Sequence, residues 1–136
     1  MKLYNKMTEL VYPRFREIIL YIIIGSLSAG TDLFLYSILT KYSNINYLII
    51  NFFTVLVGII LSFTLNRKYN FKIIDFVFKR FIIFFSIGFV GMIVSSLFLY
   101  FFIELFYLDM FLSKFLSIIL VVVIQFLLNK FITFKK

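Results

Sequence analysis

The chain has 136 residues, 63% of them hydrophobic, and it carries a formal net charge of +8. That apolar share and a mean hydropathy of +1.08 exceed what one small soluble core can bury, so the composition indicates a lipid environment. The absence of cysteine excludes disulfides and thiolate metal sites, and the absence of histidine removes the commonest general base and metal ligand. In such a chain the positive charge reports topology and contact with anionic lipids, so we expect no nucleic-acid partner.

Residues 1–16 are expected to form a cytoplasmic segment. They contain five charged residues but neither an apolar core nor a small-residue cleavage site, so we expect no cleavable signal peptide here. Leu3, Met7 and Leu10 recur at helical spacing. The segment therefore either lies on the membrane surface or is a frayed tail.

Residues 17–136 contain four apolar stretches of the length that crosses a membrane, which is about 20 residues. They span residues 18–39, 47–65, 81–103 and 110–128. The first contains one acid, Asp32, and the last contains one base, Lys114, while the middle two are uncharged. Because backbone groups in lipid must be paired within a helix or a closed barrel, the pattern predicts an all-α, polytopic protein with four transmembrane helices.

The distribution of lysine and arginine predicts the orientation. Twelve of the 14 basic residues lie in the N-terminal segment, in the connection between the second and third helices, and at the C-terminus. The other side has only Lys41 and Lys114. Because cytoplasmic loops carry the excess of basic residues, we expect a multi-pass protein of the cell membrane with both termini in the cytoplasm.

The two halves of the chain form an internal repeat at an offset of 63 residues. Each half reads as a basic segment, a helix, a short loop, a second helix, and then an asparagine followed by a basic residue. Gly25 aligns with Gly88. The two helical hairpins run in the same direction, so they are predicted to be parallel repeats about an axis along the membrane normal.

Polar residues recur every three or four positions along one face of the second helix, and the offset repeats them in the fourth. The first and third helices carry small residues, which let helix backbones approach closely. A polar stripe either packs the helices together or lines a path for a polar group, and both readings stay open here. The stripes comprise Asn51, Thr54, Gly58, Ser62 and Asn66 in the second helix, and Lys114, Ser117, Val121, Gln125 and Asn129 in the fourth.

Asp32 and Lys114 are charges within predicted membrane spans, at comparable depth and of opposite sign. An unpaired charge near mid-bilayer costs about 2.5–3.5 kcal/mol on insertion scales, so we expect the two to pair or to reach a shared polar cavity. Two alternatives remain: Lys114 snorkels to the interface, or Asp32 makes only a structural hydrogen bond.

Basic residues at the cytoplasmic helix ends form a candidate phosphate-binding cluster, if the two repeats pack face to face. The alternative is that they report topology alone. The sequence has no catalytic triad, phosphate loop, metal-ligand cluster or glycosidase-like carboxylate pair, so we expect neither enzyme activity nor a cofactor. The cluster comprises Asn66, Arg67, Lys68, Arg80, Asn129 and Lys130.

Two short motifs resemble the signature of the GtrA-like family of small four-helix membrane proteins. Residues 66–71, with Phe63 before them, match it, and residues 126–134 look like a second copy. Gly25 with Asp32, Arg80 before Phe81, and Lys114 also fit the family pattern, and the resemblance covers residues 14–136. The family usually has Arg-Phe where this chain has Leu-Tyr at residues 20–21, and the aromatic position of the signature holds Ile132 in the second copy.

The resemblance implies a role in bacterial cell-surface polysaccharide synthesis or envelope glycosylation. Family members are thought to move, or help to move, polyprenyl-phosphate-linked sugars across the inner membrane, so the lipid-linked sugar and a membrane glycosyltransferase are the implied partners. The alternatives are a small multidrug-type transporter, in which Asp32 would be the membrane acid, and a scaffold for a glycosyltransferase that transports nothing. A homo-oligomer is also expected, because four helices leave only a narrow path within one copy.

Overall fold

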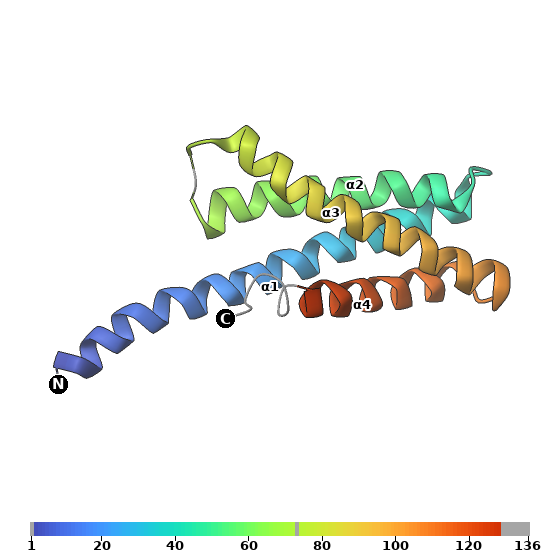
Figure 1. Cartoon of the computed structure of the whole chain (residues 1–136). Helices are drawn as coiled ribbons and strands as arrows, with labels where there is room; N and C mark the ends of the chain where they lie inside the picture. Colours follow the sequence, from blue (N-terminus) through green and yellow to red (C-terminus); the bar gives the residue numbers. More distant parts are fainter. Residues whose placement is uncertain (1, 73, 129–136) are drawn as a thin grey trace.

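The computed structural model describes residues 2–72 and 74–128, and all the regular structure in these residues is helical (Figure 1). The prediction of an all-α chain is confirmed. In chain order the elements are α1 (Lys2–Tyr42), α2 (Tyr47–Leu65), the π-helical turn η1 (Asn66–Asn70), α3 (Val77–Tyr100), the π-helical turn η2 (Phe101–Leu105) and α4 (Met110–Leu128).

The lengths and composition of these helices are those of a four-helix membrane protein. Three stretches are long and apolar enough to cross a bilayer: Phe15–Tyr42, Tyr47–Asn70 and Val77–Leu105. A shorter apolar helix, Met110–Ile124, accompanies them. The structure differs from the sequence-based bounds at α1, which begins at Lys2 rather than at residue 18, and at α3, which begins at Val77 rather than at residue 81. Helical hydrogen bonding continues through these polar turns, which hydropathy alone does not register.

The helices neighbour one another in the order α1–α2–α3–α4, and α4 returns to contact α1. In Figure 1, α3 crosses α2 obliquely, and the N-terminal part of α1 projects beyond the other helices. We call the end with Arg67, Lys68, Lys72, Lys79 and Arg80 the basic end, and the end with the short connections 43–46 and 106–109 the hairpin end. Three neighbouring pairs are joined by connecting segments, whereas α1 and α4 are not.

The apolar core lies toward the hairpin end. Tyr36, Tyr47, Ile50 and Leu99 form its buried cluster. The hydroxyl of Tyr47 donates a hydrogen bond of 2.9 Å to the carboxylate of Glu104. Large apolar side chains elsewhere point outward, as expected where hydrocarbon rather than water surrounds the helices.

Two glycines allow α2 to lie close to both of its neighbours. A Cβ added at Gly58 would lie 3.3 Å from the backbone oxygen of Ser28 in α1. A Cβ added at Gly88 in α3 would lie 2.7 Å from Cδ1 and 2.9 Å from Cγ1 of Ile59 in α2. The close approach of these helices therefore depends on glycine at both positions.

We expect Gly88→Ala to destabilise the fold by about 1–3 kcal/mol, because the new methyl group overlaps Ile59 in a packed interface. Gly30→Ala is the matched control, since no atom lies within 4 Å of its added Cβ, and it should change stability by less than about 0.5 kcal/mol. Detergent-induced unfolding followed by circular dichroism measures both. Equal effects of the two substitutions would contradict the packing role of Gly88.

Candidate functional site

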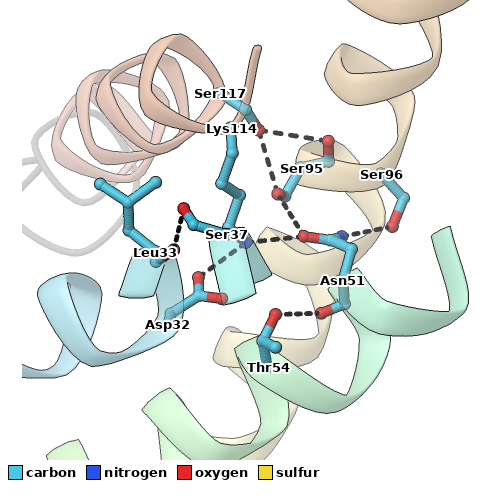
Figure 2. A network of polar contacts seen from close by, with 9 residues as sticks. All are labelled: Asp32, Leu33, Ser37, Asn51, Thr54, Ser95, Ser96, Lys114 and Ser117. Carbon is cyan, nitrogen blue, oxygen red and sulfur yellow. Dashed lines mark hydrogen bonds and ion pairs between the residues drawn. The ribbon is translucent and has the colours of Figure 1, made fainter. Parts of the chain in front are cut away.

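A buried ion pair joins α1 to α4. Nζ of Lys114 lies 2.8 Å from Oδ2 of Asp32, and the Lys114 side chain is 0% exposed. The predicted pairing of these two charges is therefore confirmed, and Lys114 does not snorkel to the interface. Figure 2 shows the lysine side chain descending from α4 toward the carboxylate on α1.

Asn51 extends this pair to the other two helices. Its Oδ1 accepts a 2.7 Å hydrogen bond from Lys114 Nζ, and its Nδ2 donates one of 2.9 Å to Ser96 Oγ in α3. Ser95 Oγ lies at 3.5 Å from the same Asn51 oxygen. One asparagine from α2 thus connects α3 with the α1–α4 ion pair (Figure 2).

A second contact ties α3 to α4 beside this network. The Oγ atoms of Ser95 and Ser117 are 3.0 Å apart, and Ser117 Oγ also donates to the backbone oxygen of Ser95 at 3.2 Å. Sequence reasoning assigned the serines of α3 only to helix packing and missed their place in the network. The signal was available, because the offset of 63 residues aligns Ser95 with Asp32.

The network repeats the internal symmetry of the chain. The offset aligns Asp32 with Ser95 and Asn51 with Lys114. The Lys114–Asp32 contact between α4 and α1 is therefore equivalent to the Asn51–Ser95 contact between α2 and α3. The same interaction is ionic in one interface and neutral in the other.

Three polar atoms of α1 and α4 are buried without a hydrogen-bond partner among the described residues. They are Asp32 Oδ1 and Tyr36 Oη on α1, and Ser113 Oγ on α4. The Tyr36 ring lies below the lysine ammonium, with 5.2 Å between Nζ and the ring centroid. Buried polar atoms normally have a partner, so this interface offers hydrogen bonds that the described protein atoms do not use.

At the basic end, Arg67 and Arg80 line one pocket of about 150 Å³. Its remaining lining is apolar and includes Phe63, Phe71 and Phe84. The guanidinium of Arg80 lies 3.8 Å from the carboxylate of Asp75, and both side chains are exposed. The structure therefore brings together two members of the predicted basic cluster, from α3 and from the turn that follows α2.

The structure places Asn66 elsewhere than in this pocket. Its amide donates to the backbone oxygen of Ser62 at 3.0 Å, and its Oδ1 accepts from Asn70 at 3.1 Å. Asn70 also donates to the backbone oxygen of Glu17 at 3.1 Å. These two buried asparagines attach η1 to α1. Asn66 therefore helps to position the turn that carries Arg67 and does not itself line the pocket.

Three predicted site residues fall outside what the structure describes. Asn129 and Lys130 lie beyond the described residues, and the side chain of Gln125 is not described. Their assignment to the polar stripe and to the basic cluster stays a prediction.

Comparison with known proteins identifies the family. The model of the GtrA/DPMS transmembrane domain matches residues 20–134, which is most of the chain. No curated protein and no solved structure matched the chain. The matched region contains α2, α3, α4 and residues 20–42 of α1, together with the buried network and the basic pocket. The chain therefore belongs to the GtrA/DPMS transmembrane-domain family, and it is a membrane protein involved in glycosylation or polysaccharide synthesis.

Proposed function

We propose that this protein moves polyprenyl-phosphate-linked sugars across the cell membrane, or assists that movement, in cell-surface polysaccharide synthesis or envelope glycosylation. The observation that carries the proposal is the pocket at the basic end, where Arg67 and Arg80 lie among phenylalanine side chains. The family match supports the process, and the pocket supports the lipid phosphate as the group recognised.

The chemistry of this pocket fits an amphipathic phosphate. Guanidinium groups bind phosphate oxygens through paired, charge-assisted hydrogen bonds. The phenyl rings of Phe63, Phe71 and Phe84 offer an apolar wall for the first isoprene units. The excess of basic residues at this end favours a cytoplasmic position, so the substrate would be received from the cytoplasmic leaflet.

The test is binding and movement of a labelled farnesyl phosphoglucose in proteoliposomes. We expect Arg67→Ala and Arg80→Ala each to weaken binding roughly 10- to 100-fold, because each removes a charge-assisted interaction of about 1.5–3 kcal/mol. Lys68→Ala is the matched control, since Lys68 lies at the same end but does not line the pocket. Its effect should stay below about threefold, as expected for a screened surface charge.

The outcomes separate the competing functions. Equal losses for the three variants would show that only the general surface charge attracts the lipid, and would contradict the pocket. Absence of binding and movement in the wild type, together with co-purification of a glycosyltransferase, would favour the scaffold.

The multidrug alternative is opposed by the structure, because the Asp32 carboxylate that would bind a cationic drug already has a cationic partner in Lys114, at 2.8 Å. A homo-oligomer remains part of the proposal. Cross-linking in the membrane would measure the number of copies.

A further inference from the structure

We propose that the interface between α1 and α4 at Asp32 and Lys114 is the intramembrane site for the phospho-sugar head group, and that this structure shows it closed. This inference rests on the proposed function. When substrate binds, the Lys114 ammonium leaves the Asp32 carboxylate and forms an ion pair with the substrate's phosphate. The freed carboxylate then accepts hydrogen bonds from the sugar hydroxyls.

The two equivalent interfaces of the repeat differ in charge. The equivalent interface between α2 and α3 has only neutral contacts of Asn51, one of 2.9 Å with Ser96 and a longer one of 3.5 Å with Ser95. Helix packing at this depth therefore does not require charges. A buried ion pair carries a desolvation penalty that a neutral contact avoids, so its presence on one side only points to a use other than packing.

Both helices of the α1–α4 interface carry buried polar atoms that make no hydrogen bond to the described residues. Tyr36 Oη and Ser113 Oγ are buried hydroxyls without a partner among the described residues, and they lie on the two helices that Lys114 and Asp32 join. When the two helices separate, these hydroxyl groups and the ammonium become available as donors for phosphate oxygens. Asp32 Oδ1, also without such a partner, supplies an acceptor for a hydroxyl group. This combination matches a sugar phosphodiester and not an apolar lipid tail.

The topology leaves α1 and α4 without a direct connection. The pairs α1–α2, α2–α3 and α3–α4 are each joined by a connecting segment, whereas α1 and α4 are neighbours without one. Separation of α1 from α4 therefore strains no loop. The interface can open sideways to the bilayer, which lets a head group enter while its isoprenoid chain stays in lipid.

Cysteine accessibility tests the opening, because the chain has no cysteine of its own. Ser113→Cys places a thiol at a position that is 0% exposed in the closed state. A methanethiosulfonate reagent should label it at least tenfold faster when farnesyl phosphoglucose is added, and farnesol should have no such effect. Ile50→Cys is the matched control, since Ile50 is the repeat equivalent of Ser113 and is 2% exposed, and its labelling should not change.

A double substitution tests the ion exchange. Asp32→Ser with Lys114→Asn copies the neutral residues of the equivalent interface into this one. We expect its unfolding midpoint to match that of the wild type and its affinity at the basic pocket to be kept. Movement of farnesyl phosphoglucose should fall at least tenfold.

The inference is overturned, and the proposed function stands, if wild-type protein moves the lipid while the label at Ser113→Cys stays unchanged or the double variant moves the lipid normally. Both fall together if wild-type protein neither binds nor moves farnesyl phosphoglucose. If farnesyl phosphate accelerates the labelling of Ser113→Cys as much as farnesyl phosphoglucose does, the phosphate is the group recognised. This result would support the exchange at Lys114. Faster labelling with farnesol as well would remove the phosphate from the explanation and contradict it.

Discussion

Lys114→Ala is expected to lower the free energy of unfolding by about 3–5 kcal/mol. The substitution leaves the Asp32 carboxylate buried in the bundle without its cation and removes the donor to Asn51. Titration with sodium dodecyl sulfate in detergent micelles, followed by circular dichroism, measures the change.

Lys41→Ala is the control for this experiment. Lys41 lies in the last turn of α1 at the hairpin end, is exposed, and should contribute less than about 0.5 kcal/mol. Replacing Asp32 by Ser together with Lys114→Asn should restore most of the lost stability, because no charge is then left alone. A Lys114→Ala protein as stable as the wild type would show that the buried pair does not hold α1 against α4.

Asn51→Leu should lower the free energy of unfolding by about 2–3 kcal/mol, since it leaves buried polar partners unsatisfied. Asn51 is 0% exposed and contacts Lys114 and Ser96 through opposite ends of one amide. Leucine fills a similar volume but offers neither the donor nor the acceptor. The same unfolding titration measures the loss.

Thr64→Leu controls for the added apolar surface on α2. The Thr64 hydroxyl bonds only within its own helix, to the backbone oxygen of Ile60, and the residue is exposed. Its replacement should change stability by less than about 0.5 kcal/mol. A cost for Asn51→Leu near 0.6 kcal/mol, the average for one hydrogen bond between membrane helices, would mean that the network is ordinary packing and not a coupled unit.

Much of the architecture was predictable from the sequence, because the deciding signals are local or periodic. Hydropathy over about 20 residues identifies a membrane helix wherever it packs. The repeat placed the stripe residues of the second and fourth helices in register. Depth and sign indicated that Asp32 and Lys114 either pair or reach a shared polar cavity, and the structure decided for the pair.

The tertiary structure decided which polar residues meet. From the sequence, Ser95 and Ser96 were interpreted as packing residues. In the structure, the orientation of α3 about its axis brings both side chains against Asn51. Asn66 shares its motif with Arg67, yet it bonds to Asn70 and helps attach η1 to α1, while Arg67 lines a pocket with Arg80. Adjacent residues on a helix point about 100° apart, so the rotation of each helix separates them into different environments.

By itself, the sequence determined that this is a four-helix membrane protein with two similar halves and a pair of opposite charges within its spans. Only the tertiary structure decided that α1 and α4 meet without a connecting loop, that their contact is ionic where the equivalent contact of α2 with α3 is neutral, and that both helices carry buried hydroxyl groups without a partner among the described residues. The physical reason is that helix formation depends on near neighbours in the chain, whereas helix rotation and pairing depend on packing between segments far apart in sequence.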